Sequence, residues 1–211
     1  MADGNPESRC RGVPAKREAI LLAAKKIFFQ KGFRAAGMEA IARSAGVSKQ
    51  TVYSHFGSKE ALFEAMVSDR VDGLVAPTIG SAAAGRPIRD VLTDIARGFI
   101  AFYLDPESIG LFRVVVAESG RFPKMAHAVY RAGPERAADA LAAYLGRQAE
   151  KGLLTAPDSR SAARFFFGML RGDIYMRALL GVDLDASRDA IDALAREAVA
   201  VFLRAYGSAE A

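Results

Sequence analysis

Apolar residues recur at helical spacing along almost the whole chain. In AKREAILLAAKKIFFQKG, residues 15–32, they fall three and four positions apart, which puts them on one face of a helix. Gly32 predicts the end of that helix. Alanine, leucine and arginine are abundant and valine-rich alternating runs are scarce, so we expect almost no sheet.

The next elements predict two helices joined by a short glycine turn. Residues 38–45 (MEAIARSA) carry inward-facing alanine and isoleucine, and Gly46 follows where a left-handed C-terminal cap belongs. Ser48 is suited to cap the second helix, predicted over 49–55, through its hydroxyl. The segment therefore has the order helix, turn, helix, and its second helix is polar.

Further helices are predicted in the rest of the chain, with glycine, proline and small residues between them. The first begins at Ser58 and ends near Val75, and residues 76–87 (APTIGSAAAGRP) predict a loop. Gly133-Pro134 predicts a break between two later helices. The later spans are 88–104, 108–119, 123–131, 134–151, 159–180 and 187–206. Together these elements predict an all-α fold.

Charge is distributed unevenly along the chain. The net charge is +5, yet residues 1–60 hold eleven Lys or Arg and five Asp or Glu, whereas the remaining 151 residues hold eighteen and nineteen. All of the excess positive charge is therefore in the first 60 residues. This predicts a polyanion as the partner of the N-terminal part alone.

The sequence lacks the usual parts of several kinds of active site. Cys10 is the single cysteine, so neither an internal disulfide nor a thiolate metal cage is expected. His55 and His127 are the two histidines, and no GxGxxG, P-loop or GxSxG motif occurs. We expect no enzyme activity, no metal site and no cofactor.

The stretch SKQTVYSHFGSKE, residues 48–60, combines two turn-starting serines, two lysines, a tyrosine and a histidine. In a helix-turn-helix, the second helix enters the major groove while the first crosses the DNA backbone. Val52 and Phe56 are four residues apart and can hold the second helix to its neighbour, which leaves a polar face outward. The predicted DNA contacts on and beside that face are Ser48, Lys49, Gln50, Thr51, Tyr53, Ser54, His55 and Lys59.

These residues divide into two groups by their chemistry. Gln50 can offer a bidentate amide to an adenine edge, Thr51 can give a base a hydroxyl or methyl contact, and Lys49 can reach a guanine or a phosphate. Phosphate contacts are predicted for Ser48, Tyr53, His55 and Lys59. Taken singly, each residue also has a plain explanation as a helix cap, a packing residue or a solvated lysine.

Residues 14–70 resemble the N-terminal domain of TetR-family transcriptional regulators. The family's first helix, ending in F-x-x-x-G, appears as Phe28 to Gly32, and its core appears as IARSAGVSKQTVYSHFGSKEALFEAM. Met38 departs from the pattern, because the family often has a threonine or serine there that contacts the DNA backbone. By this resemblance, DNA contacts carry over to Ser48, Lys49, Tyr53, His55 and Lys59.

The C-terminal half resembles the AefR-like subgroup of the same family. The residues that carry this second resemblance are LFRVVVAESGRFPKMAHAVYRAGPERAADALAAYL followed by KGLL. The predicted architecture is a flexible basic arm over 1–13, a three-helix helix-turn-helix DNA-binding domain over 14–60, and a helical ligand-binding and dimerisation domain over 61–211. The resemblance implies a homodimer, and we expect its interface in the last two helices of each subunit.

The resemblance also implies an effector pocket inside the larger domain. Candidate lining residues are aromatic and aliphatic positions on its predicted helices, namely Phe99, Phe102, Tyr103, Phe112, Val116, Phe166, Met169 and Leu170. Candidate polar selectors are Arg113, Glu118 and Asp173. The alternative for each aromatic is a plain place in the core, and Arg113 and Glu118 can simply pair with each other.

The function predicted from all of this is a sequence-specific DNA-binding regulator of transcription. Repression is the family's commonest mode, so we expect a repressor that a small apolar or amphipathic effector releases from a palindromic operator. Two alternatives stay open: a DNA-bound factor outside transcription, such as a cell-division inhibitor, and a regulator switched by a protein partner. The first twelve residues are polar and no apolar run of about 18 residues follows. We therefore expect a soluble cytoplasmic protein with no membrane contact, associated with the nucleoid when bound to DNA.

Overall fold

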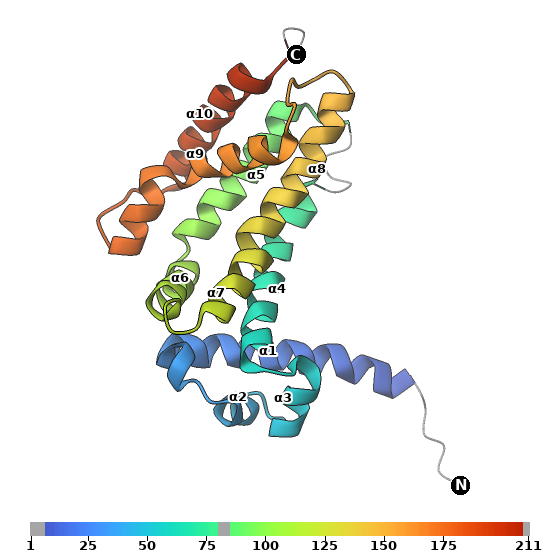
Figure 1. Cartoon of the computed structure of the whole chain (residues 1–211), viewed down its shortest axis with the longest axis vertical. Coiled ribbons are helices and arrows are strands. Elements are labelled where there is room, and N and C mark those ends of the chain that lie inside the picture. The colour runs from blue at the N-terminus through green and yellow to red at the C-terminus, as the bar shows by residue number, and fades with distance from the viewer. Residues whose placement is uncertain (1–6, 80–84, 209–211) are drawn as a thin grey trace. The chain divides into compact units, whose positions relative to one another are not determined.

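The periodicity of the sequence becomes a series of helices in the computed structural model (Figure 1). The structure describes the backbone of residues 7–79 and 85–208 and the side chains of residues 15–69 and 85–208. Within these ranges, extended segments meet only at an isolated antiparallel bridge between Leu154 and Gly207. The prediction of an all-α fold is confirmed.

The helices fall into two units, each with its own core. One unit holds the residues up to Ser68 together with Arg113–Val129, and the other holds Asp69–Phe112 together with the chain from Tyr130 onward. In chain order the elements are α1 (Glu7–Ala35), α2 (Met38–Ser44), α3 (Lys49–Phe56), α4 (Lys59–Ile79), α5 (Ile88–Leu104), α6 (Pro106–Glu118), α7 (Pro123–Tyr130), the π-helical turn η2 (Arg131–Glu135), α8 (Arg136–Glu150), α9 (Ser159–Leu180) and α10 (Arg188–Tyr206).

A cluster of three phenylalanines forms the core of the first unit. Phe28 and Phe33 of α1 lie 5.7 Å apart between ring centroids, and Phe63 of α4 meets their rings edge-on at 4.8 and 5.3 Å. All three side chains are fully buried. Phe122, before α7, adds a fourth ring 5.2 Å from Phe33. Burying each ring stabilises the unit by roughly 1.5–3 kcal/mol, and each edge-on pair adds about 0.5–1.5 kcal/mol.

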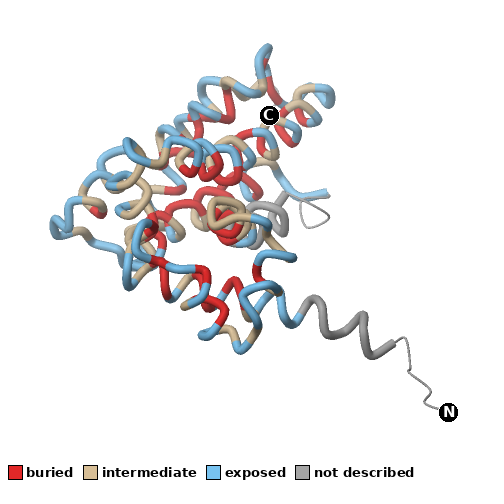
Figure 2. Tube along the Cα trace, turned by 60° about the horizontal axis from the view of Figure 1, so that its bottom comes forward, coloured by how far each residue is buried: buried red, intermediate tan, exposed pale blue. Residues whose placement is uncertain are grey.

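The second unit is built from α5, α8, α9 and α10, which pack against one another along their apolar faces. Figure 2 shows buried residues alternating with exposed ones along the helical trace, as expected for amphipathic elements. Phe166 of α9 and Phe202 of α10 are fully buried, and their ring centroids lie 5.1 Å apart. Leu92 and Ile100 of α5 and Leu141 of α8 complete this core.

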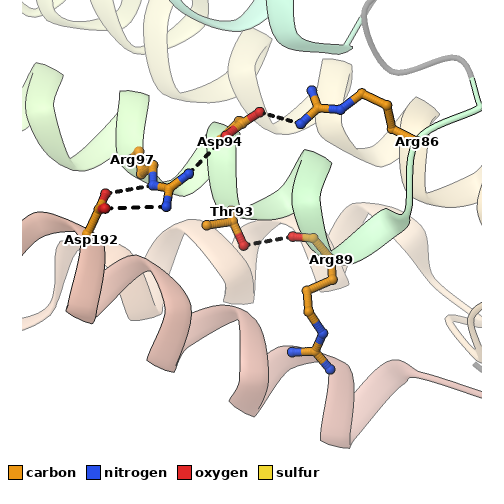
Figure 3. A network of polar contacts seen from close by, with 6 residues as sticks. All are labelled: Arg86, Arg89, Thr93, Asp94, Arg97 and Asp192. Carbon is orange, nitrogen blue, oxygen red and sulfur yellow. Dashed lines mark hydrogen bonds and ion pairs between the residues drawn. The ribbon is translucent and has the colours of Figure 1, made fainter.

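A chain of ion pairs ties α5 to α10 beside that core (Figure 3). Arg97 of α5 donates through Nε to Asp192 Oδ1 of α10 at 2.6 Å and through a second nitrogen to Asp94 at 3.2 Å. Arg86 donates to Asp94 from the other side at 2.6 Å. These side chains are partly exposed, so each pair contributes at most about 1 kcal/mol. Their main effect is to fix which residues of α5 and α10 face each other.

Prolines do not end helices where the sequence suggested that they would. The predicted break at Gly133-Pro134 is wrong, because the π-helical turn η2 joins α7 to α8 without interruption. In η2 the Arg136 N–H donates to the Arg131 carbonyl five residues earlier, and this wider turn accommodates a proline that lacks an N–H. Likewise α4 continues through Pro77 to Ile79, beyond the predicted end near Val75.

The N-terminal helix is also longer than its periodicity indicated. It begins at Glu7, inside the segment predicted as a flexible arm, and residues 1–6 of that segment lie outside the described residues. Gly32, the predicted end, has φ 71° and ψ 171°, which interrupts the helix before a last turn to Ala35. Among the described residues, no helix combines the length and apolar character that crossing a bilayer requires.

Candidate functional site

The turn between α2 and α3 sets the direction of α3. Gly46 has φ 67°, a left-handed conformation that side chains with a Cβ rarely adopt. Its N–H donates to the Arg43 carbonyl at 3.3 Å, and the Val47 N–H donates to the Ala42 carbonyl at 3.0 Å. These two bonds make a Schellman motif, which satisfies the last carbonyls of α2 and turns the chain sharply.

The first turn of α3 is capped by Ser48, as the sequence predicted. Its Oγ accepts from the Thr51 N–H at 3.0 Å and lies 2.8 Å from Thr51 Oγ1. Val52 is fully buried and anchors the helix, whereas Phe56 is half-buried beneath the Arg17 guanidinium. The other side of α3 is open to solvent.

The residues predicted to contact DNA lie on the solvent side of α3, and they differ in exposure and in the hydrogen bonds that they already make. Lys49 and Gln50 are exposed, and in the part of the chain that the structure describes their side chains have no hydrogen-bond partner. Tyr53 is 43% exposed. The Ser54 hydroxyl donates to the Thr51 carbonyl at 2.9 Å, so its proton is already engaged. Thr51 and His55 are half-buried at the edge of the same face.

Lys59 has a more enclosed environment than the other predicted contacts. Ser58 caps α4 by accepting from the Ala61 N–H at 3.0 Å, and Lys59 is the first residue of that helix. Its Nζ donates to the Arg34 carbonyl at 3.0 Å and lies 4.7 Å from the centre of the Phe33 ring. Burial lowers the pKa of Lys59, although the carboxylates of Glu60 and Glu118 oppose that shift. Two of the three ammonium donors stay available for a phosphate.

Met38 shows what the departure from the TetR pattern does. It is the first residue of α2, its side chain is buried, and the Gly37 before it provides no side-chain cap. At this position the chain therefore has a packing residue where the family often has a hydroxyl. A shallow hollow beside it, lined by Glu39, Ala42, Arg43, Val47 and Lys49, continues the polar surface from α2 to α3.

The second unit holds a cavity between α5, the α7–α8 junction and α9. It opens to solvent and is small, with a volume of about 40 Å³. One wall is aromatic, because Phe99 stacks on Phe167 at 4.4 Å and lies tilted against Tyr103 at 4.5 Å between ring centroids. The lining residues are Phe99, Tyr103, Tyr130, Pro134, Glu135, Ala138, Arg164, Phe167 and Arg171.

Two of the residues proposed from the sequence, Phe99 and Tyr103, line this cavity. Phe102 and Phe112 lie behind Tyr103 in the same aromatic cluster, and Phe166 and Leu170 are buried in the core. Met169 is half-buried, and Asp173 is exposed and pairs with Arg177 at 3.8 Å. Arg113, Val116 and Glu118 belong to the other unit.

Sequence reasoning missed the cationic part of the cavity lining. Arg164, Phe167 and Arg171 are spaced three and four residues apart, so they share one face of α9. Two arginines on one face of a helix rich in aromatics were a usable signal. The prediction chose the bulky residues at 166, 169 and 170, which lie on other faces of the same helix.

Tyr103 places a neutral hydroxyl at the aromatic wall. Burial raises the pKa of Tyr103 to about 12, and the charge and hydrogen bond of the Arg171 guanidinium oppose that rise. The hydroxyl therefore keeps its proton at physiological pH and can donate a hydrogen bond to a bound molecule.

Comparisons with known families cover both units. Residues 20–66 match the bacterial regulatory proteins of the tetR family, and residues 90–208 match the C-terminal domain of AefR-like transcriptional repressors. The helix-turn-helix and the regulatory part are therefore matched separately.

Solved structures of similar proteins extend over nearly the whole chain. A protein described as a TetR-family transcriptional regulator from Mesorhizobium loti MAFF303099 is 30% identical with a TM-score of 0.79, over 97% of this chain and 100% of that one. The flavonoid-responsive regulator FrrA is 32% identical with a TM-score of 0.73, over 91% of this chain and 97% of its own.

Curated relatives match over a shorter region. The transcriptional activator FasR of Mycolicibacterium smegmatis is 42% identical over 74 residues, which are 35% of this chain and 34% of FasR. The regulator RutR of Escherichia coli K12 is 46% identical over 69 residues, 33% of this chain and 32% of RutR. These matches thus span about a third of each relative. With the family matches over both units, the chain belongs to the TetR family of DNA-binding transcriptional regulators.

Proposed function

We propose that this protein is a homodimeric repressor that binds a palindromic operator through α3 and is released by a small effector bound in the second unit. The observation that carries the proposal is the solvent face of α3, where Lys49 and Gln50 stand exposed on a helix fixed by a buried Val52. A helix held on one side and polar on the other fits the major groove.

The residues of this face would have separate roles in the complex. Gln50 and Thr51 would read base edges, because their side chains offer amide and hydroxyl groups near the start of the helix. Ser48, Tyr53, His55 and Lys59 would hold the helix against phosphates, and Lys49 can serve either purpose. Ser54 would contribute least, since its hydroxyl proton is held by the Thr51 carbonyl.

The sign of regulation is proposed from the C-terminal family match. That match, to AefR-like repressors, covers residues 90–208, the part expected to respond to an effector. FasR is named an activator, but it matches only about a third of this chain. FrrA, similar over nine-tenths of the chain, is named for its response to flavonoids, which supports a small-molecule effector here.

The outer faces of α9 and α10 support the proposed dimer. Phe165 and Met176 of α9 are 63% and 55% exposed and lie on either side of a non-helical kink at Gly172, and Val201 of α10 is 38% exposed. Apart from the glycine's own chain neighbours and nearby helix backbone, no atom in the described part of this subunit lies within 4 Å of where a Cβ on Gly168 or Gly172 would be. Exposed apolar side chains beside small residues suit a second helix packed from outside.

Sedimentation velocity tests the dimer. Phe165→Glu together with Met176→Glu should convert the dimer to monomer, because each change puts a charge into the proposed interface. Leu22→Glu is the matched control, since Leu22 is a 69% exposed apolar residue on α1. A dimer that survives the double substitution would place the interface elsewhere.

Selection of binding sites from random DNA tests the function itself. The expected product is an inverted repeat whose half-sites lie about 34–36 Å apart centre to centre, the spacing at which two recognition helices meet one face of B-DNA. A selected site upstream of a gene, and increased transcription when the protein is removed, complete the test. Dispersed sites with no effect on transcription would contradict regulation and favour a structural role on DNA.

A further inference from the structure

The surface between α2 and α3 holds a shallow hollow that the predicted DNA contacts leave mostly unused. Its lining residues are Glu39, Ala42, Arg43, Val47 and Lys49, and of these only Lys49 belongs to the predicted set. Glu39 and Arg43 lie on α2, the first helix of the helix-turn-helix, and their side chains are 71% and 80% exposed. The hollow therefore presents charged groups of α2 beside the start of α3.

The backbone around this hollow is held in place by the packing of α2. That helix buries Met38, Ile41 and Ala42. Glu39 and Arg43 are four positions apart, so their side chains share one face of the helix. The Schellman turn that follows brings the first residue of α3 to the edge of the hollow. The charged ends of the side chains can thus rearrange over a fixed backbone.

The two charges on α2 form only a weak ion pair. Arg43 Nη2 lies 3.8 Å from Glu39 Oε1, whereas charge-assisted hydrogen bonds between nitrogen and oxygen are about 2.7–2.9 Å long. Exposed ion pairs of this kind contribute little to stability and are screened by salt. Arg43 can therefore exchange Glu39 for a stronger acceptor at small cost.

The lining of the hollow carries more positive charge than negative. Of the described residues that form it, Glu39 is the acid, and Arg43 and Lys49 are the cations. Within the described part of the chain, the Lys49 side chain makes no ion pair or hydrogen bond. An anion brought to this surface would therefore meet two cationic donors and one repelling carboxylate.

A phosphate of the DNA backbone is the anion that suits this position. When the second helix of a helix-turn-helix enters the major groove, the first helix crosses the backbone. Arginine presents a planar fork of N–H donors that matches two phosphate oxygens, and lysine adds a point charge. A carboxylate at the same place repels a phosphate.

We propose that Arg43 leaves Glu39 to bind an operator phosphate, with Lys49 as the second cation, and that Glu39 limits the affinity for DNA by competing for Arg43. The inference rests on the proposed function, because it adds a contact site to the DNA-binding face. It gives α2 a part in binding that the predicted contacts assign to α3 and to the start of α4.

Operator binding by charge-neutralising variants of the full-length protein tests both parts of the proposal. The probe is a fluorescently labelled duplex carrying the inverted repeat selected from random DNA. Arg43→Gln should weaken binding about tenfold on every single-base operator variant and reduce the slope of log K against log salt by about 0.9 for each subunit. Glu39→Gln should instead tighten binding about threefold at low salt, and the gain should shrink as salt screens the charges.

The double variant Glu39→Gln with Arg43→Gln shows whether the two residues act through each other. If Glu39 competes for Arg43, its removal should give a smaller gain once Arg43 is also replaced. Glu150→Gln and Arg147→Gln are the matched controls, because both residues are exposed on α8 in the other unit and the net charge changes equally. Melting curves without DNA show whether each variant is folded.

Several results would overturn the inference. An unchanged salt slope in Arg43→Gln would remove the phosphate contact, and a loss confined to one base pair of the operator would make Arg43 a base contact. Weaker binding by Glu39→Gln would make Glu39 a favourable contact, such as an acceptor for the amino group of cytosine. An undiminished gain in the double variant would show that Glu39 does not act through Arg43.

Wild-type binding to the same duplex, measured alongside, separates this inference from the proposed function. If wild type binds the operator and the variants of α2 behave like the variants of α8, the inference fails and the regulator stands. If wild type shows no preference for any DNA sequence, the proposed function fails.

Discussion

The two candidate sites of this protein are built in different ways. The face of α3 comes from eight consecutive residues, and its geometry follows from local bonds: the Schellman turn at Gly46, the Ser48 cap and the buried Val52. The cavity of the second unit comes from α5, the α7–α8 junction and α9, which are separated by dozens of residues. A site built by one helix can be predicted from the sequence, whereas a site assembled from distant segments is found only in the structure.

The sites also differ in how their charged groups are held. On α3, the side chains of Lys49 and Gln50 are exposed to solvent. In the cavity, Arg171 is held along its own helix by the Phe167 carbonyl and lies beside aromatic rings. Side chains held in place before binding favour one shape of partner, whereas an exposed polar face adapts to the surface it meets.

The largest expected effect is the loss of stability when a buried ring is removed from either core. Phe63→Ala and Phe166→Ala each remove a fully buried ring, so each should lower the free energy of unfolding by about 3–5 kcal/mol. Hydrogen exchange followed by peptide should show the loss of protection in α1 and α4 for Phe63→Ala and in α9 and α10 for Phe166→Ala. Equal loss throughout both variants would show that the two units unfold together.

Much of the fold follows from the sequence because helix periodicity and capping are local. The predicted spans 88–104 and 159–180 match the bounds of α5 and α9, and Ser48 and Ser58 accept capping bonds from backbone N–H groups. The break predicted at Pro134 is absent, because a π-helical turn accommodates both the missing N–H and the space that the proline ring takes from the preceding carbonyl. Local rules do not show whether a helix continues past such a residue.

The candidate sites show the same limit at the level of side chains. Lys49 and Lys59 each follow a capping serine, so the sequence describes them alike. Only packing distinguishes them, because the C-terminal end of α1 and the ring of Phe33 contact Lys59, whereas no such contact meets Lys49 within the described residues. Whether Arg164 and Arg171 form ion pairs likewise depends on which helices pack nearby.

The preference of the protein for particular operator bases should depend on α3 and on no part of the second unit. Gln50→Ala should cost about 1–3 kcal/mol in operator binding and relax preference at one position of each half-site, because a bidentate amide contact would be lost. Ser54→Ala is the control, since the Ser54 hydroxyl already donates to the Thr51 carbonyl. Binding assays across single-base operator variants measure both. A uniform loss over all sequences would make Gln50 a backbone contact.

The smallest expected effect is the difference between Lys49 and Lys59 in DNA binding and in stability. If both touch phosphates, Lys49→Gln and Lys59→Gln should each reduce the slope of log K against log salt by about 0.9. Lys59→Gln should also lower the free energy of unfolding by about 1 kcal/mol, because it removes the bond to the Arg34 carbonyl, while Lys49→Gln should not. Operator titrations at several salt concentrations, together with urea unfolding, distinguish the roles. An unchanged slope with lowered stability in Lys59→Gln would make Lys59 a clamp on the end of α1 and leave the phosphates to α3.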